Sequence, residues 1–526
     1  MSPLFKLKRK VNIPSSFNFS DTEEKPDKQK CDTKLLTKDF TVNIDILKKE
    51  FNYPLNSDLY IRNVYISSLK ATGILFCIGV ISNLKTLEEH ILAPLLENCN
   101  EINKDNAIDD IMIKILTIKQ SKKSSDVSLI VDDILNGHTA LIIDGYDEAI
   151  LMSAEGIEHR SVERPSNENV LKGPKEAFIE SSVVNRSLIR KQIRNKNLIT
   201  ESIVVGELSP SDISLMYMKN IVDDRIVERV KKRITQIKVD TIQNTEMLEQ
   251  HIEERPYSLV PTVLYTERAD RAVSYILEGH VALIMDNSPA ALILPVTFWT
   301  FFHTGEEQYQ RWAYGNFIRL IRAIAFIVSF LTPSLYIAAT NYHQDMLPSD
   351  LLLAIAGTRE TIPLPVIAEV LLMEISFELI REASTRIPAT IGPTIGIVGA
   401  LILGQAAVEA NIVSPILVII VALTGLASFA IPEISFSYLI RIGKFIGIFF
   451  SSILGLFGLS GFLIGFTAYL ISIKSFGVPF LAPLAPHYSS SRDIIMRPPV
   501  WKEFIRPFNL STKNKIKKKP PKGGLK

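Results

Sequence analysis

Cysteine is scarce in this chain of 526 residues, which contains only Cys31, Cys77 and Cys99. Three cysteines without metal-like spacing exclude a disulfide framework and a zinc site as the basis of the fold. Free thiols of this kind are typical of a reducing compartment. The basic start MSPLFKLKRK has no apolar run behind it. We therefore expect no signal peptide, and a first domain that stays in the cytoplasm.

Motifs of catalysis are missing as well. The chain has no P-loop, no H-E-x-x-H pattern and no nucleophile elbow. His303 and His343 are isolated, whereas His138 and His280 stand at the starts of apolar strands, where a structural role is expected. We predict a protein that is not an enzyme and that holds no metal and no cofactor. The net charge of +2 provides no overall basic field, so nucleic acid is not an expected partner.

Long apolar runs are absent from residues 1–310 but dominate residues 323–475. This asymmetry predicts a soluble region followed by a membrane region. We expect an α/β N-terminal cytoplasmic region of two similar subdomains, followed by an all-α helical transmembrane bundle of about six spans.

The two similar subdomains are predicted from an internal repeat. The segment ILNGHTALIID (134–144) returns as ILEGHVALIMD (276–286), 142 residues later and with eight of its eleven positions identical. A strand followed by an amphipathic helix is expected upstream of each copy, at 71–96 and 211–234. The alternative is that two unrelated hairpins resemble each other by coincidence.

Each copy of the repeat reads as a helix end, a glycine, an apolar strand, a turn and a second strand. The turns are expected at Asp144-Gly145 and at Asp286-Asn287. These residue types tolerate the backbone angles that a tight turn requires. The pattern therefore predicts a β-hairpin in each subdomain.

Composition also marks a linker between the two copies. Residues 160–180 are rich in proline, glycine and polar side chains, and the basic run NRSLIRKQIRNKNL that follows is interpreted as a solvated helix face. The expected segments are a disordered tail (1–38), cytoplasmic α/β subdomain 1 (39–160), a linker with a basic helix (161–200), cytoplasmic α/β subdomain 2 (201–298), an interfacial aromatic segment (299–319), a transmembrane helical domain (320–475) and a basic cytoplasmic tail (476–526).

The interfacial segment is predicted from its aromatic side chains, which are Trp299, Phe301, Phe302, Trp312 and Tyr314. Aromatic residues concentrate where a membrane protein meets the headgroup layer. Their position just before an apolar stretch favours this interpretation. The alternative is a packed amphipathic helix of the soluble region.

Six apolar stretches are long enough to cross a bilayer, which takes roughly 17–25 residues. Basic residues flank them on one side only, apart from Arg359, and continue in the Lys-rich tail. By the positive-inside rule we place both termini in the cytoplasm, where the tail could bind anionic lipid headgroups. The last two spans, joined by GLSG (458–461), are expected to form a tight helical hairpin. The spans are 320–340, 362–380, 391–409, 412–431, 439–457 and 459–475.

Glycines at G-x-x-x-G spacing recur in the apolar half. This spacing lets two helix backbones approach closely, so we expect a packed bundle and helix contacts that could also join subunits of an oligomer. The spacing does not indicate a function. The pairs are Gly392 with Gly396, Gly443 with Gly447, and Gly461 with Gly465.

Carboxylates interrupt the run EVLLMEISFELIREASTRIP (369–388), which overlaps the second predicted span (362–380). Glu374, Glu378 and Glu382 fall within an arc of about 80° on one helix face. Arg381 and Arg386 follow Glu378 and Glu382 at helical spacing and are expected partners of these two acids. No such local partner exists for Glu374.

A mid-span carboxylate costs a few kcal/mol or more unless it faces protein or water. One hypothesis is that Glu369 and Glu374 line an ion pathway or form a gating contact, and Glu378 joins them as a candidate. The alternative is a structural role, as buried acids that are protonated or hydrogen-bonded to a neighbouring helix. Four further residues fit a polar route or a broken span: Pro363 and Pro365 as a hinge or kink, and Gln405 and Glu409 as polar groups.

Several long runs resemble one known family. GPKEAFIES, PYSLVPTVLYTERADRAVSYILEGHVALIMDNSP, EVLLMEISFELIREASTRIP, IGIVGALILGQAAVEANIVSP and SFGVPFLAPLAP are similar to the signature runs of the spore germinant-receptor A-subunit family, the GerA type. The resemblance extends from about residue 40 to about residue 505 and keeps the order of the runs. The N-terminal tail and the Lys-rich C-terminus lie outside it.

The resemblance implies a place in the inner membrane of a dormant spore. It implies a complex with a transporter-like B subunit, thought to bind the nutrient, and with a lipoprotein C subunit. The A subunit is thought to form a homo-oligomer, for instance a pentamer, that acts as a nutrient-gated ion channel. Two alternatives stay open: a secondary transporter with proton-coupled intramembrane carboxylates, and a scaffold that relays signals without conducting. Transporters usually show repeated transmembrane halves, and no such repeat is found within residues 320–475.

Overall fold

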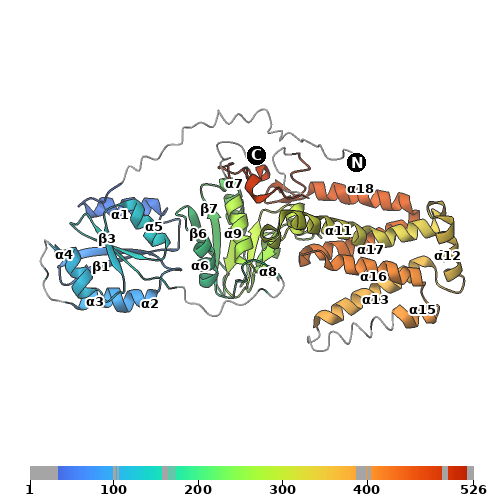
Figure 1. The fold of residues 1–526 in the computed structure, drawn as a ribbon, viewed down its shortest axis with the longest axis horizontal. Helices are drawn as coiled ribbons and strands as arrows, with labels where there is room; N and C mark the ends of the chain where they lie inside the picture. The colour runs from blue at the N-terminus through green and yellow to red at the C-terminus, as the bar shows by residue number, and fades with distance from the viewer. Residues whose placement is uncertain are drawn as a thin grey trace, which may run out of the picture.

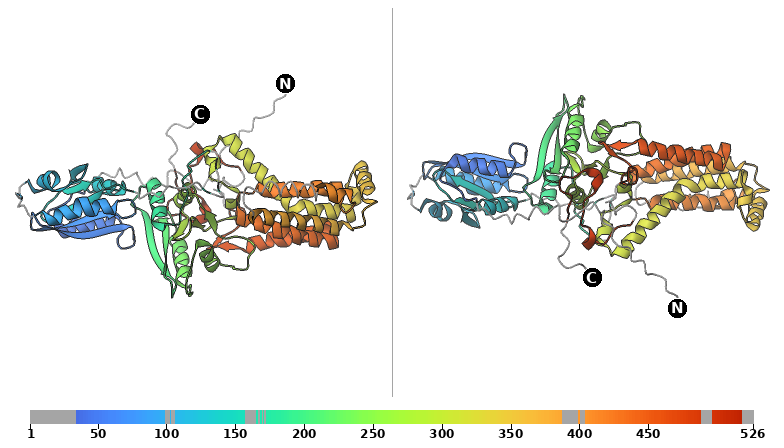
Figure 2. Two further views of the ribbon diagram at one scale, coloured as in Figure 1. Left: turned by 90° about the horizontal axis from the view of Figure 1, so that it is seen from below. Right: turned by 90° about the horizontal axis from the view of Figure 1, so that it is seen from above.

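The computed structural model describes residues 34–98, 102, 106–156, 165, 168, 170, 172–386, 399, 404–487 and 496–517. Figure 1 shows an elongated arrangement in which a first sheet, a second sheet and a helical bundle follow one another along the long axis. The bundle helices run side by side away from the second sheet, as both views of Figure 2 show. The α/β region and the helical region are thus separate layers, in the order predicted.

The first sheet has five strands in the order β1-β2-β4-β5-β3, and every neighbouring pair is antiparallel. Helices cover both of its faces, and apolar clusters fill the space on each side. One face carries α1 (Phe40–Glu50) and α5 (Val127–Leu135), and the other carries the helical stretches between residues 84 and 115. The strands are β1 (Leu59–Ile66), β2 (Ala71–Ile78), β3 (Ser121–Ser124), β4 (Thr139–Ile143) and β5 (Ala149–Met152); the helical stretches are α2 (Leu84–Leu87), η1 (Glu88–Leu92), α3 (Ala93–Glu97), α4 (Ala107–Asp110) and η3 (Ile111–Ile115).

The second sheet repeats this plan in the order β6-β7-β9-β10-β8, again with every pair antiparallel. The registers correspond, since Phe76 pairs with Ala140 in the first sheet and Met216 pairs with Ala282 in the second. The internal repeat therefore did predict a repeated fold. The elements are β6 (Leu198–Val205), β7 (Ser211–Met218), β8 (Leu264–Thr266), β9 (Val281–Met285), β10 (Ala291–Leu294), α6 (Ser182–Gln192), α7 (Asp224–Thr235), α8 (Thr245–Ile252) and α9 (Ala269–Glu278).

The hairpin turns lie where the dipeptides predict them. Gly145 has φ of +84° and Asn287 has φ of +62°. Glycine adopts this left-handed region freely, and asparagine is the side chain that tolerates it best. β4 and β9 are buried along their whole length because helices cover both faces of each sheet, which explains why their sequences are continuous apolar runs.

His280 stands directly before β9 and is buried. Its Nδ1 lies 2.6 Å from the carbonyl oxygen of Pro295, so the ring is placed to donate a hydrogen bond. Burial lowers the pKa of His280 to about 4, since the charged ring would lose its hydration; the Pro295 carbonyl opposes this shift. The structural role expected for this histidine fits these contacts.

Lowering the pH should destabilise the protein through His280. The unfolded state takes up a proton near pH 6.5, while the folded state does so only near pH 4, so the free energy of unfolding falls across that window by on the order of 3 kcal/mol. We expect His280→Asn to flatten this part of the pH dependence, because asparagine can keep the hydrogen bond but cannot titrate. Thermal unfolding of the full chain at several pH values checks this. An unchanged slope in the variant would contradict it.

Asp58, immediately before β1, joins the first sheet to the second. Its fully buried carboxylate accepts hydrogen bonds from Arg190 Nε at 2.5 Å, Arg186 Nη1 at 2.7 Å and Thr200 Oγ1 at 2.6 Å. Burial alone would raise the pKa of Asp58, but the two guanidinium groups hold it below its ordinary value. The interpretation of the basic run as a solvated face is therefore wrong for Arg186 and Arg190. Both arginines lie on α6 and bind an acid more than a hundred residues earlier in the chain.

The bundle consists of helices that only partly match the six predicted spans. Among the described residues, α11 and α17 are long and apolar enough to cross a membrane, while α16 and α18 are shorter apolar helices. Most of the predicted span 391–409 lies outside the described residues. The helices are α11 (Trp312–Asn341), α12 (Ser349–Arg359), α13 (Val366–Arg386), α15 (Ala407–Glu409), α16 (Pro415–Phe429), α17 (Ile434–Leu454) and α18 (Leu456–Ser472).

The tight connection between the last two helices is present, but not where it was predicted. α17 ends and α18 begins at Gly455, whereas the GLSG run (458–461) is already helical. Gly455 has φ of +60° and ψ of −133°, a region that side chains other than glycine rarely adopt. Sequence reasoning chose the wrong glycines because helical glycines and turn glycines look alike in an apolar run.

One apolar cluster runs from the second sheet into the bundle. It joins residues of α6 and α9 to rings from α11 and α17. Phe301 stacks on Phe436 with ring centroids 5.4 Å apart, and Phe302 lies edge-on to the same ring at 5.3 Å. Both belong to η4 (Phe298–Phe302) and are buried, so for them the alternative of a packed segment holds. Trp312 and Tyr314 are exposed, and their interfacial position stays a prediction.

Candidate functional site

Glu374 is a fully buried acid in the middle of α13. Its Oε2 pairs with Lys444 Nζ from α17, and its Oε1 accepts a hydrogen bond of 3.4 Å from Thr424 Oγ1 of α16. Figure 1 shows α13 beside α16, with which it is in contact. The acid without a local partner thus has a partner on another helix.

Glu378, one turn later, meets three cations. Arg441 of α17 donates to its Oε2 from Nε at 2.7 Å and from Nη2 at 2.5 Å. Lys444 Nζ lies 3.6 Å from its Oε1, and Arg381 Nη1 lies 3.7 Å from the same atom. We call Glu374, Glu378, Arg381, Arg441 and Lys444 the ion-pair ladder.

Arg381 also fixes the ladder to α16. Its Nη2 donates to Ser428 Oγ at 2.5 Å. Its guanidinium lies over the rings of Phe377 and Phe429, at 5.1 Å and 4.7 Å from their centroids. Such cation–π contacts add attraction where water is excluded. The predicted pair of Glu378 with Arg381 is therefore present, although Arg441 approaches the acid more closely.

Glu369 lies apart from the ladder, near the start of α13. It is buried, and its Oε1 pairs with Arg359 Nη2 at 3.2 Å. Its Oε2 accepts a hydrogen bond of 3.2 Å from the backbone N–H of Ser414, the residue that caps α16. Arg359, the basic residue that strayed from the positive-inside pattern, is thus neutralised by an acid.

The contacts explain how charges are tolerated among apolar helices. An isolated charge in a low-dielectric interior costs several kcal/mol, whereas a well-made pair offsets much of that cost. The ion pairs are energetically favourable only while α13 and α17 remain together, because separation would leave unpaired charges on both helices. The ladder can therefore hold two helices in one register and resist their separation.

The other predicted site residues are placed less centrally. Gln405 Nε2 donates to Glu409 Oε1 at 2.9 Å, and both side chains are exposed. Pro363 and Pro365 precede α13 rather than kinking it, since the helix begins at Val366. They lie in the break between α12 and α13. The expected pair of Glu382 with Arg386 lies outside the described side chains.

Two of the three predicted glycine pairs lie among the described residues, and they differ. A Cβ at Gly443 would come within 2.5 Å of Phe330, and one at Gly447 within 2.9 Å of Ser334 Oγ, so α17 packs closely on α11 there. Gly461 and Gly465 of α18 have open space where a Cβ would stand. Gly392 and Gly396 lie outside the described residues.

Sequence reasoning did not assign site roles to Lys444, Arg441, Arg359 or Thr424. One signal was available: Arg441 and Lys444 are three residues apart on α17, and Glu374 and Glu378 are four apart on α13. Both spacings place like charges on one helix face. Two helices with complementary charged faces can pair, but the sequence does not say which helices are neighbours.

Fold and site together define a class: proteins in which a doubled antiparallel α/β region is packed on an apolar helical bundle that contains buried ion pairs. The model of the family described as Bacillus/Clostridium GerA spore germination protein matches residues 45–509. The chain therefore belongs to the GerA spore germination protein family.

Two relatives agree with this assignment. Spore germination protein KA of Bacillus subtilis is 37% identical over 486 residues, which cover 92% of this chain and 89% of that protein. Spore germination protein GerLA of Bacillus cereus is 34% identical over 477 residues, covering 90% of this chain and 96% of that protein. A crystal structure of the N-terminal domain of the A subunit of the Bacillus megaterium spore germinant receptor GerK3 matches with a TM-score of 0.39 and 25% identity, covering 50% of this chain and 97% of that one.

Proposed function

We propose that this chain is the A subunit of a nutrient-responsive spore germination receptor and that copies of it assemble to form or gate an ion channel. In this proposal the chain crosses the spore inner membrane several times, with both termini in the cytoplasm, and ion release triggers germination. A transporter-like B subunit binds the nutrient, and a lipoprotein C subunit and membrane lipid complete the assembly. Membership of the GerA family supports the role in germination.

The ion-pair ladder is the observation that supports the gating part of the proposal. Glu369 and Glu374 are enclosed by helices of their own chain. Their burial favours a gating contact, which holds the closed arrangement, over the wall of an open lumen. Charge pairs that must be broken in an apolar environment give such a contact a high threshold. Opening then requires a ligand that favours the separated arrangement.

Other residues fit an assembly around a polar path. Gln405 and Glu409 are exposed and provide polar groups for such a path in the proposal. Gly461 and Gly465 leave room on α18 for the close approach of a helix from another subunit. These features support the oligomer as part of the same proposal.

The test replaces Glu374 by glutamine, which keeps the shape but removes the charge that faces Lys444. Receptor complexes in lipid vesicles loaded with potassium are exposed to nutrients, and potassium release is recorded. We expect Glu374→Gln to release potassium at about tenfold lower nutrient concentration or without nutrient, because a charge-assisted contact worth ~1.5–3 kcal/mol is weakened. Glu360→Gln, at an exposed acid at the end of α12, is the matched control and should behave like the wild type.

Three results would count against the proposal. Wild-type vesicles that release no ions on nutrient addition would favour a relay scaffold. Release that requires a proton gradient would favour the secondary transporter. A Glu374→Gln complex that assembles and responds like the wild type would leave the ladder with a structural role alone.

A further inference from the structure

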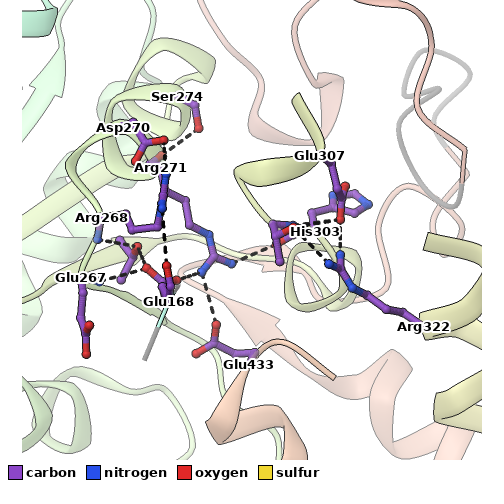
Figure 3. A network of polar contacts seen from close by, with 12 residues as sticks. Glu168, Glu267, Arg268, Asp270, Arg271, Ser274, His303, Glu307, Arg322 and Glu433 are labelled. Carbon is purple, nitrogen blue, oxygen red and sulfur yellow. Dashed lines mark hydrogen bonds and ion pairs between the residues drawn. The ribbon is translucent and has the colours of Figure 1, made fainter. Parts of the chain in front are cut away.

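A second polar network lies between the second sheet and the bundle, and Arg271 is at its centre (Figure 3). Arg271 is the third residue of α9, and its side chain is only 5% exposed. A buried guanidinium is tolerated when acceptors surround it, and its planar fork can bind several at once. The partners of Arg271 therefore decide which segments it joins.

Those partners come from three separate parts of the chain. Arg271 Nη1 pairs with Glu168 Oε1, and the same nitrogen lies 3.5 Å from Glu433 Oε2. Arg271 Nη2 donates to the carbonyl oxygen of His303 at 3.1 Å. Glu168 belongs to the linker between the two sheets, Glu433 directly precedes α17, and His303 lies in the segment that leads to α11.

Glu168 is held by hydrogen bonds from the end of β8 and the residue that follows it. Its Oε2 accepts from Thr266 Oγ1 at 2.7 Å and from the backbone N–H of Glu267 at 3.2 Å. Arg268 holds the same linker through the carbonyl oxygen of Pro174, at 3.1 Å. Glu168 and Pro174 are therefore both held by the consecutive residues Thr266, Glu267 and Arg268.

Glu433 connects the Arg271 network to α17, the helix that carries the cations of the ion-pair ladder. Its backbone carbonyl accepts the N–H of Ser437 at 3.0 Å, within the first turn of α17. Arg441 and Lys444 follow on the same helix, two and three turns further. Burial, together with the charge of Glu168, raises the pKa of Glu433 to about 7, and Arg271 opposes that shift. The charged form of Glu433 thus depends on the guanidinium beside it.

α11 is held differently. Glu307, which is buried, pairs with both Arg319 and Arg322 of α11, and Arg322 Nη1 also donates to the carbonyl oxygen of Phe302 at 3.0 Å. Figure 3 shows this pair of Glu307 and Arg322 beside the Arg271 network. The entry to α11 is thus held by Glu307 and also by the distant Arg497, whose Nη1 donates to the carbonyl oxygen of Glu307 at 2.5 Å and whose carbonyl oxygen accepts from Trp312 Nε1 at 2.7 Å.

We propose that Arg271 is a positioning residue that ties the start of α17 to Glu168, so that a shift of Glu168 is passed along α17 to the ion-pair ladder. Glu168 and Glu433 share one guanidinium nitrogen, so a shift of Glu168 changes how firmly Arg271 holds Glu433. α17 transmits the change because its backbone hydrogen bonds make it stiff along its axis. The consequence for gating rests on the proposed function; the mechanical tie does not.

The test measures hydrogen–deuterium exchange in the intact receptor complex in lipid nanodiscs. Arg271→Gln should speed exchange at residues 437–444 by about tenfold, because the charge-assisted contact that anchors the helix start is lost. Arg271→Lys should give a smaller change, since a point charge cannot reach all the acceptors. Arg255→Gln is the matched control, because Arg255 links the α/β region to a different helix, through Ser472 at the end of α18. Its loss should leave the exchange rate of residues 437–444 unchanged.

A purely structural role would show itself elsewhere. If Arg271 only stabilised the second sheet, exchange in β9 would rise with that in α17, and this result would overturn the proposal. Unchanged exchange at residues 437–444 would overturn it as well. Glu168→Gln should change both the exchange of α17 and the nutrient threshold for ion release. If exchange changes and nutrient response does not, the tie is supported and the proposed gating function fails.

Discussion

Methionine in place of Lys444 is expected to lower the free energy of unfolding of the helical region by about 3–5 kcal/mol. The substitution keeps the length of the side chain but leaves Glu374, which is fully buried, without its cation. Thr424, the other partner of Glu374, supplies only a long neutral hydrogen bond of 3.4 Å. Thermal unfolding of the purified chain in detergent, followed by loss of helical signal, measures the effect.

A second substitution separates charge from packing in this experiment. Glu374→Gln in the Lys444→Met background removes the stranded charge, so most of the lost stability should return. Lys474→Met is the control, since Lys474 is an exposed cation in β11 (Lys474–Ser475). If the single Lys444→Met variant unfolded like the wild type, the ladder would not be a stabilising contact, and the gating proposal would lose its physical basis.

Asparagine in place of Asp58 is expected to destabilise the α/β region by about 3–5 kcal/mol. The carboxylate is the common acceptor of Arg186, Arg190 and Thr200, and a neutral amide would leave the buried guanidinium of Arg190 and the partly buried one of Arg186 without an anion. Denaturant unfolding of the full chain, followed by far-ultraviolet circular dichroism, gives the change in the free energy of unfolding. Most of the lost free energy should come from the weakened contact between the two sheets.

Asp109 provides the comparison for Asp58. It pairs with Lys123 at 3.0 Å, but both side chains are about half exposed, and exposed pairs contribute roughly 0–1 kcal/mol. Asp109→Asn should therefore change stability little. Equal effects of the two substitutions would mean that the joint at Asp58 is open to water and does not hold the sheets together. Acid should act in the same direction as Asp58→Asn, because a carboxylate whose pKa is lowered on folding loses its contribution as pH falls through the folded value.

The parts of this fold that could be predicted are those that local patterns determine. The repeat at 134–144 and 276–286 predicted two hairpins with the same surroundings, because the same residues make the same strands and turns. Apolar runs bounded by turn residues predicted β4 and β9, whose sides are both buried. The resemblance to the GerA family was confirmed over nearly the whole chain. Multiple crossings and the orientation of the termini stay predictions, since two described helices meet the length and hydropathy of a span.

The charge partners could not be predicted, because they depend on which helices are neighbours. Glu374 and Lys444 are 70 residues apart, and Asp58 and Arg190 are 132 apart. Reasoning along one helix found Arg381 beside Glu378 but had no means of finding Arg441. The burial of Phe301 was missed for the same reason, since its ring is covered by Phe436 from α17.

The spacing within the ladder has one more consequence. Acids recur every four residues on α13, at Glu374, Glu378 and Glu382, while the cations Arg441 and Lys444 are three apart on α17. The two rows run in opposite directions, because Lys444 faces Glu374 and Arg441 faces Glu378. A slip of one helical turn, about 5.4 Å, would bring Lys444 fully onto Glu378 and Arg441 to the level of Glu382. Half a turn would strand both cations. The two rows of charges therefore favour relative positions of α13 and α17 that differ by a whole helical turn, and they disfavour the positions between.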